Sequence, residues 1–216
     1  MRKFAVAAAA VAMPIGMLAA TGGVAFAGHG GSSKVDVSKD SISCTVAATA
    51  GLAPHITSTS IPSKVNSTIH VTLSACTVSG PVALPAGTTV TGSGTGVLHV
   101  TTTGVTGVPT PAMATTGKIT INWTATAADL STVKLAAPQS KLSIGTVSVS
   151  TNGALPTSNA TLSVGSTSVK GDFAGADNGA TSSLTGTTTQ TLSDIQTALT
   201  GAGLSSVGFG GPISLG

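Results

Sequence analysis

Charged residues are scarce in this 216-residue chain, which contains no Glu, one Arg, eight Lys and six Asp. The formal net charge is only +3, and it falls to about +1 if Arg2 and Lys3 are removed with a leader segment. Nucleic-acid binding depends on clustered Lys and Arg that neutralise phosphates. A near-neutral chain offers no such cluster, so the composition excludes nucleic acid as a partner.

Aromatic residues and catalytic motifs are also few. The chain has no Tyr, and Trp123, Phe173 and Phe209 are the only aromatic residues beyond the first 30 positions. Three residues cannot build a stacking face for sugars, and we expect them in the core. A G-x-S-x-G nucleophile elbow and a paired-acid motif are both absent. We therefore assign no catalytic residue and expect no cofactor.

The first 27 residues are typical of a signal peptide. Arg2 and Lys3 precede an apolar stretch at residues 4–20, and the tripeptide at residues 25–27, Ala-Phe-Ala, places small residues where a signal peptidase cuts. A retained membrane anchor is the alternative, because about 17 apolar residues is the lower limit for crossing a bilayer; Pro14 and Gly16 argue against it. We expect a signal peptide at residues 1–27, a flexible Gly/Ser tether at 28–34 and a single domain at 35–216.

The two Cys residues predict a disulfide. Cys44 and Cys76 both lie in strand-like segments, and an exported chain with an even number of Cys residues usually oxidises them. The alternative, a reactive or metal-binding thiol pair, lacks the support of a C-x-x-C spacing. Closing this loop would stabilise the fold by roughly 3 to 4 kcal/mol.

Hydrophobic residues make up 41% of the chain, so the low charge does not predict disorder, which also requires low hydrophobicity. They alternate with polar residues in a period of two, as where Ile119, Ile121 and Trp123 flank Thr120 and Asn122. Similar strands are expected at residues 41–47, 53–58, 69–73, 96–103, 142–149, 160–170, 181–188 and 205–215. Many short strands with turns between them predict an all-β fold, an antiparallel β-sandwich of the immunoglobulin-like or Greek-key type.

Two features interrupt this alternation. Leu142 and Ile144 follow one phase and Val147 and Val149 the other, which predicts a bulge at Gly145. Residues 108–116, VPTPAMATT, predict a connection between strands.

The segment TLSDIQTALTGAG predicts one short helix near the C-terminus. Ser193 can cap its start, with Gln196 three residues on as in a capping box, and Gly201 can end it. Leu192, Ile195 and Leu199 would then face the core.

The order of short motifs is also informative. SISCTV, GLAPHIT, VTLSACTVSG, KITINWTATAADLSTVK, VKGDFAGAD and GLSSVGFGG follow one another along the chain. This order resembles the uncharacterised Thr/Ser-rich secreted β proteins of actinobacteria, in which a Cys pair brackets the first sheet segment and an I-x-W strand is followed by Ser-Thr. The resemblance implies export and a β architecture, and it implies no activity.

Two groups of residues are candidate metal ligands. In GDFAGADNG, the oxygen atoms of Asp172, Asp177 and Asn178 can converge on calcium, although Asp-Asn-Gly also forms turns for backbone reasons, which is the explanation we favour. His29 follows the expected N-terminal Gly28, and there an amine and an imidazole can bind copper adventitiously. We favour a solvated His29 in the tether.

The remaining imidazoles do not predict a metal site. His55, His70 and His99 are separated along the sequence, and the chain has no Glu to join them as a zinc ligand.

These observations predict an exported, non-enzymatic protein of the cell surface or extracellular space, with association with the cell wall as one of its expected locations. We expect cell-wall or protein partners at sheet edges, and no membrane association after signal cleavage. The alternative is a secreted hydrolase or metal-dependent enzyme whose site combines residues distant in sequence. A cluster of Asp and His in a pocket would favour the enzyme, and flat Thr/Ser faces would favour the interaction protein.

Overall fold

The computed structural model describes residues 34–59, 64–102, 113–150, 159–175 and 183–216, all within the unit Ser32–Gly216. The predicted signal peptide, residues 1–27, and residues 28–33 of the predicted tether lie outside the described residues. The secondary structure consists, in chain order, of β1 (Ser41–Ile56), β2 (Lys64–Ser79), β3 (Thr89–Thr102), β4 (Met113–Thr126), β5 (Thr132–Val133), β6 (Gln139–Ser150), β7 (Asn159–Gly171), β8 (Ser183–Thr191), α1 (Leu192–Thr200) and β9 (Leu204–Leu215).

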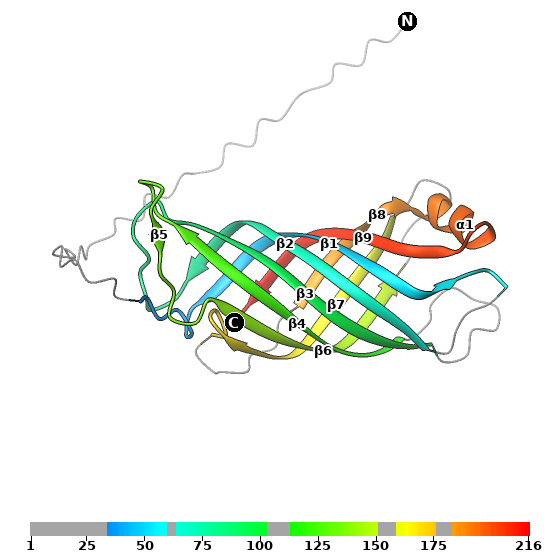
Figure 1. Cartoon of the computed structure of the whole chain (residues 1–216), viewed down its shortest axis with the longest axis horizontal. Coiled ribbons are helices and arrows are strands. Elements are labelled where there is room, and N and C mark those ends of the chain that lie inside the picture. Colours follow the sequence, from blue (N-terminus) through cyan, green and yellow to red (C-terminus); the bar gives the residue numbers. More distant parts are fainter. Residues whose placement is uncertain (1–33, 60–63, 103–112, 151–158, 176–182) are drawn as a thin grey trace, which may run out of the picture. The chain divides into compact units, whose positions relative to one another are not determined.

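The strands form one antiparallel sheet that closes on itself (Figure 1). Strands β1, β2, β3, β4, β6, β7, β8 and β9 each pair with the strand before and the strand after, and β9 returns to pair with β1. Residues Ile42 and Leu215 are partners in this closing ladder. The short β5 pairs with the end of β4.

The all-β class, the antiparallel pairing and the helix near the C-terminus are confirmed. The strands lie in one closed sheet, however, and not in two packed sheets. An apolar face on each strand can be buried either between two sheets or inside one sheet that curls on itself. The pairing of β1 with β9 selects the second solution, and alternation within a strand carries no information about that pairing.

Alternation within each strand separates an apolar inner face from a polar outer face. In β2 the side chains of Val65, Ile69 and Leu73 are buried, whereas those of His70 and Thr72 between them are exposed. The same alternation in the other strands fills the interior with Val, Ile and Leu and leaves Thr, Ser, Lys and His outside. Eight strands enclose a space that side chains can fill.

Three inward glycines of β3 let large side chains of β4 approach its backbone. A Cβ atom at Gly92 would lie 2.8 Å from the Trp123 ring, and one at Gly94 would lie 2.8 Å from the Thr120 carbonyl oxygen. At Gly96 it would lie 2.4 Å from the Lys118 carbonyl oxygen. Glycine inside a strand often marks such a close approach, and at Gly96 the Ile119 side chain would lie 2.7 Å from the added Cβ atom.

One end of the closed sheet is covered by residues 35–40, which we call the N-terminal strap. Val35 pairs with Leu135, and the Val37 carbonyl accepts a hydrogen bond of 3.0 Å from the Phe173 N–H. Val37 and Phe173 are fully buried, and Phe173 packs edge-on against Trp123 at 5.0 Å between ring centroids. The strap and these two rings therefore close the Trp123 end.

The local predictions were largely confirmed. The β6–β7 register shifts on both sides of Ile144 and skips Gly145, as the predicted bulge requires, and Val147 beyond it packs against the core. Helix α1 ends at Thr200, with Gly201 as its C-cap as predicted. Ile195 and Leu199 are half-buried but do not belong to the hydrophobic core, and the side chain of Leu192, the third residue expected to face it, lies outside the described residues.

Three boundaries were wrong. The strands expected at residues 41–47 and 53–58 are one continuous strand, β1. The helix is capped by Thr191 and not by Ser193, because the Thr191 hydroxyl accepts from the Asp194 N–H while the Asp194 carboxylate accepts from the Thr191 N–H. Residues 113–116 belong to β4, so that part of the predicted connection at 108–116 is strand.

Candidate functional site

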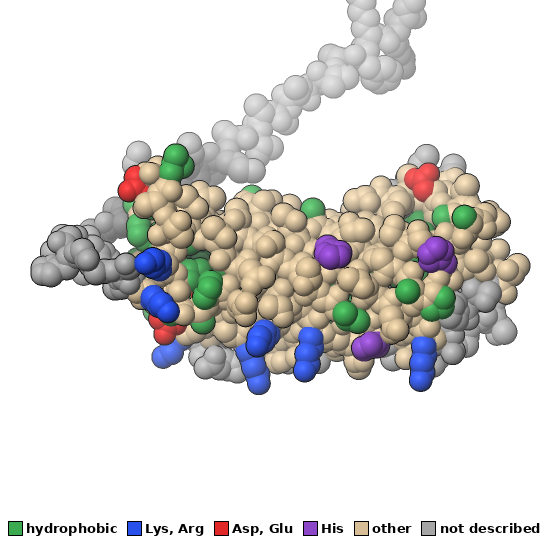
Figure 2. All heavy atoms as spheres, in the orientation of Figure 1, with side chains coloured by type: hydrophobic (Ala, Val, Ile, Leu, Met, Phe, Trp, Pro, Cys, Tyr) green, Lys and Arg blue, Asp and Glu red, His purple; other side chains and the backbone are tan. Residues whose placement is uncertain are grey.

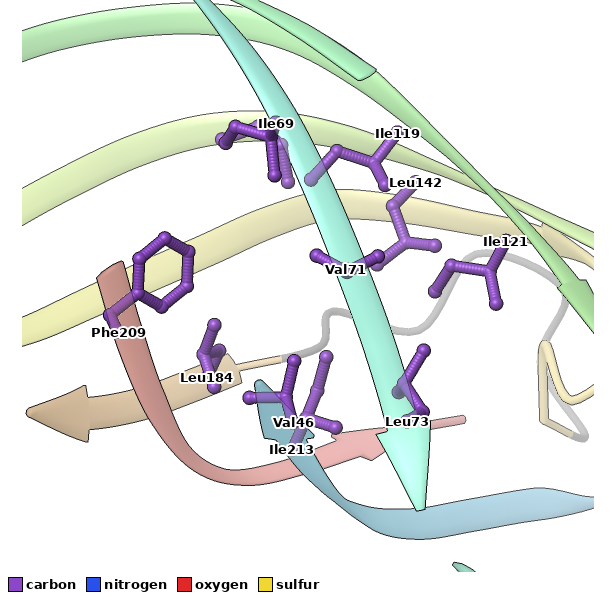
Figure 3. A pocket seen from close by; sticks show the side chains of 11 residues that line it. Val46, Ile69, Val71, Leu73, Ile119, Ile121, Leu142, Leu184, Phe209 and Ile213 are labelled. Carbon is purple, nitrogen blue, oxygen red and sulfur yellow. The ribbon is translucent and has the colours of Figure 1, made fainter. Parts of the chain in front are cut away.

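The interior of the closed sheet holds an apolar cavity of about 40 Å³. Figure 3 shows side chains from opposite parts of the sheet converging on it, among them Phe209, Leu184 and Ile69. All eleven lining side chains are hydrophobic: Val46, Ile69, Val71, Leu73, Ile119, Ile121, Leu142, Ile144, Leu184, Phe209 and Ile213.

This cavity is a small packing gap in the core. Ligand sites for small molecules have volumes of about 300 to 1,000 Å³ and contain a few polar groups that orient the ligand. The interior cavity is several times smaller, and none of its lining side chains is polar. It can neither hold a metabolite nor orient one.

A second hollow, of about 440 Å³, lies in the connection between β2 and β3. Its volume falls in the range of ligand sites. Its lining comes only from residues 76–90, and no Asp, Lys or His is among them. The hollow therefore has no acid, base or charge with which to perform chemistry.

Asp172 lies in a polar group at the Trp123 end. The indole N–H of Trp123 donates to the Ser140 hydroxyl at 2.7 Å, and that hydroxyl donates to the backbone carbonyl of Asp172. The Asp172 side chain is fully buried, and neither of its carboxylate oxygens accepts a hydrogen bond of normal geometry. Burial raises the pKa of Asp172 to about 6; the negative charge of Asp36 adds to this rise, and the Ala137 N–H opposes it.

Asp40 in the strap is a second buried carboxylate. Its Oδ1 accepts a hydrogen bond of 3.1 Å from the Val82 N–H, which fastens the β2–β3 connection to the strap, and its Oδ2 has no partner. Burial raises the pKa of Asp40, the charge of Asp36 raises it further, and the Val82 N–H acts in the opposite direction. Both buried carboxylates are thus bound into the packing of the Trp123 end.

The structure describes one of the three predicted calcium ligands. Asp177 and Asn178 lie outside the described residues, as does the copper candidate His29. Among the residues that are described, no three His, Cys, Asp or Glu side chains are grouped so that they could hold a metal ion. The calcium site therefore stays a prediction.

The imidazoles of the described wall are exposed and lie on different strands. His55 is on β1, His70 on β2 and His99 on β3. The His99 Nδ1 lies 2.8 Å from the side-chain oxygen of Asn66, its cross-strand partner. Asp172 is buried at the Trp123 end, so the described residues do not join Asp and His in a pocket.

The predicted disulfide is present between Cys44 and Cys76 on the adjacent strands β1 and β2, with 4.1 Å between their Cα atoms. The β1–β2 register shifts between Ser43 and Thr45, and Ala75 takes a positive φ of 50° beside Cys76. The disulfide thus fastens the two strands at an irregularity in their ladder.

One arrangement was missed at the sequence level: a row of lysines on the outer face. Lys118 on β4, Lys141 on β6 and Lys170 on β7 are exposed on three neighbouring strands, and we call them the lysine row. Figure 2 shows Lys side chains along one side of the molecule. The signal in the sequence was that the charged residues within the strand segments are lysines, with no acidic residue among them.

Comparison of this chain with protein-family models, with curated proteins and with solved structures gives no match. Among the described residues, no helix combines the length and the apolar character needed to cross a membrane.

Proposed function

We propose that this chain is an exported protein of the cell surface or extracellular space that works as an interaction protein, through the outer wall of its closed sheet. One observation carries the proposal: the inner face is occupied by the protein's own side chains, and the outer face presents Thr, Ser, Lys and His. The interior gap of about 40 Å³ leaves no room for a substrate.

Three further features support this proposal. The first 27 residues have the pattern of a signal peptide, and the Cys44–Cys76 disulfide is of the kind that persists in an oxidising compartment. The resemblance to Thr/Ser-rich secreted β proteins of actinobacteria agrees with both. We place the contact surface on the outer faces of the strands, because every described strand except the two-residue β5 is paired on both sides.

Export and contact can be tested in one experiment. The full chain would be produced in a secreting bacterium, and the medium, the envelope and the cytoplasm would be analysed by intact-mass spectrometry with and without reduction. We expect an oxidised protein that begins at Gly28, in the medium or bound to the envelope. Full-length protein in the membrane fraction, or protein with free thiols in the cytoplasm, would contradict the proposal.

The enzyme alternative makes a different prediction. A dispersed active site would depend on individual His or Asp residues, so replacing His70 or His99 by Ala would abolish activity while leaving secretion and thermal stability unchanged. An interaction protein of the proposed kind would retain its envelope binding in both variants.

A further inference from the structure

The three side chains of the lysine row are close neighbours. Lys141 and Lys170 are directly opposite each other in the β6–β7 ladder. In the β4–β6 ladder Lys141 pairs with Thr120, so Lys118 is its diagonal neighbour. Opposite residues have Cβ atoms about 5 Å apart and diagonal ones about 7 Å apart, so three positive charges are concentrated in one patch.

Among the described residues, no acidic side chain balances this patch. The chain has no Glu, and none of the Asp residues that the structure describes lies in a strand. Those that the structure describes lie in the strap, in the turn after β4, directly after β7 and on α1. On the face shown in Figure 2, the acidic side chains lie toward the two ends of the molecule. Within the described part of the chain, no acidic side chain pairs with a lysine of the row.

Structural roles do not account for the lysine row. Like charges directly opposite each other on a sheet are destabilising. Lysines protect open sheet edges from aggregation, but β4, β6 and β7 are each paired on both sides. Strand propensity does not account for the row either, because Lys is depleted from strands.

We infer that the lysine row binds an anionic glycopolymer of the cell surface, a hydroxyl-rich chain with a phosphate or carboxylate group on each repeat. The inference rests on the proposed function and names the partner of the outer wall. A lysine ammonium recognises either anion as a point charge. Thr116 and Thr120 flank Lys118 on the same face of β4, so hydroxyl groups suited to the polymer's own hydroxyls surround the charges.

Other classes of polymer fit the row less well. Neutral sugars are recognised largely through exposed aromatic rings, and here Trp123, Phe173 and Phe209 are all buried. Duplex nucleic acid requires more neutralising contacts than three lysines supply for tight binding. A flexible polymer with one charge on each repeat can match a short row.

The test is a binding measurement on the purified, secreted full chain. Binding to poly(glycerol phosphate) and to polygalacturonate would be measured by calorimetry, with dextran and duplex DNA as comparisons. We expect binding to one or both anionic polymers and none to dextran, and the preferred polymer identifies the anion. Three charge contacts predict affinity that falls about 20- to 40-fold between 50 and 200 mM salt.

A matched pair of variants locates the site. Changing Lys118, Lys141 and Lys170 together to Gln should weaken polymer binding at least tenfold. Changing Lys34, Lys39 and Lys134 to Gln removes the same charge from exposed positions near the acidic strap and should change binding less than twofold. Thermal melting of both variants confirms that they are folded.

The outcomes separate the inference from the proposed function. If the wild-type protein binds neither anionic polymer, if the variant in the lysine row binds as the wild type does, or if duplex DNA binds more tightly than both polymers, the inference is overturned. If isolated envelopes retain the secreted wild type and the lysine-row variant to the same extent, the inference that the lysine row binds the polymer is overturned. The proposed function is then unaffected. Failure of export would remove the proposed function itself.

Discussion

Replacing Asp172 with Asn should make the stability of this protein less dependent on pH between 5 and 7. The Asp172 carboxyl is fully buried, neither of its oxygens accepts a hydrogen bond of normal geometry, and its pKa is raised from 3.8 to about 6. In the unfolded chain the same group ionises at its ordinary, lower pKa. The folded state therefore binds the proton more tightly, and ionisation favours unfolding.

The size of the effect follows from the shift. One pKa unit corresponds to about 1.36 kcal/mol, so the buried charge lowers the free energy of unfolding by at most about 3 kcal/mol above pH 7 and by nothing below the unfolded pKa. Stability is thus present at low pH and lost as the pH rises through about 6. Between pH 7 and pH 5 the wild-type protein should regain about 1.3 kcal/mol, a rise in Tm of roughly 3 to 5 °C for a domain of this size.

The assay is thermal unfolding of the wild type and of Asp172→Asn at pH 5, 6 and 7, in the presence of a chelator. Asp40, whose pKa is raised as well, is present in both proteins, so the difference between their pH slopes isolates Asp172. Asp129→Asn is the control, because hydrogen bonds from Ser131 lower the pKa of that exposed carboxyl and it stays ionised over this range. Equal slopes in wild type and Asp172→Asn would refute the reasoning.

Calcium gives the same variant a second use. If Asp172 is part of the predicted calcium site, added calcium should raise the Tm of the wild type and not that of Asp172→Asn. If the Tm of neither protein responds to calcium, the calcium site is contradicted, and Asp-Asn-Gly in GDFAGADNG is explained by its preference for turns.

Two further predictions concern the framework. Replacing Cys44 and Cys76 together by Ser should lower the free energy of unfolding by roughly 3 to 4 kcal/mol; a urea midpoint equal to that of the oxidised wild type would contradict a structural role for the bridge. Gly94→Ala places a Cβ atom 2.7 Å from Val71 and 2.8 Å from a backbone carbonyl oxygen, so it should lower the free energy of unfolding by about 1 to 3 kcal/mol. Gly51→Ala is the control, because its added Cβ atom meets its nearest neighbour at 3.8 Å and should change the free energy of unfolding by less than about 0.5 kcal/mol. Equal urea midpoints for the two glycine variants would refute the close approach of β4 to β3.

The features predicted correctly from the sequence are those set by neighbours along the chain. Alternation identified the strands because the buried face repeats every second residue, and a change of its phase located the bulge at Gly145. The helix was found for the same reason. Its cap was misplaced because Thr191 and Ser193 are both followed three residues later by a side chain that can complete a capping box, and only the end of β8 decides between them.

The closed sheet and the lysine row depend on contacts that local patterns do not encode. The ring is completed by pairing β1 with β9, whose paired residues are 148 to 173 positions apart in the sequence, and the register of that ladder is set by packing inside the sheet. Lys141 and Lys170 become neighbours only through the β6–β7 register. The burial of Asp172 likewise depends on the strap, which arrives from the other end of the chain.

Closure of the sheet also explains how a chain with so few charges can have long, hydroxyl-rich strands without edge-to-edge aggregation. An open sheet exposes unpaired N–H and C=O groups at its edges, and proteins commonly protect such edges with charged side chains, especially Lys. The described strands contain only four charged residues, and three of them form a single row. Pairing β9 with β1 removes the long edges, so protection by charge is not needed elsewhere in the described wall. The lysines of the row are therefore not needed to protect a sheet edge from aggregation. Their position is better explained by binding to a partner.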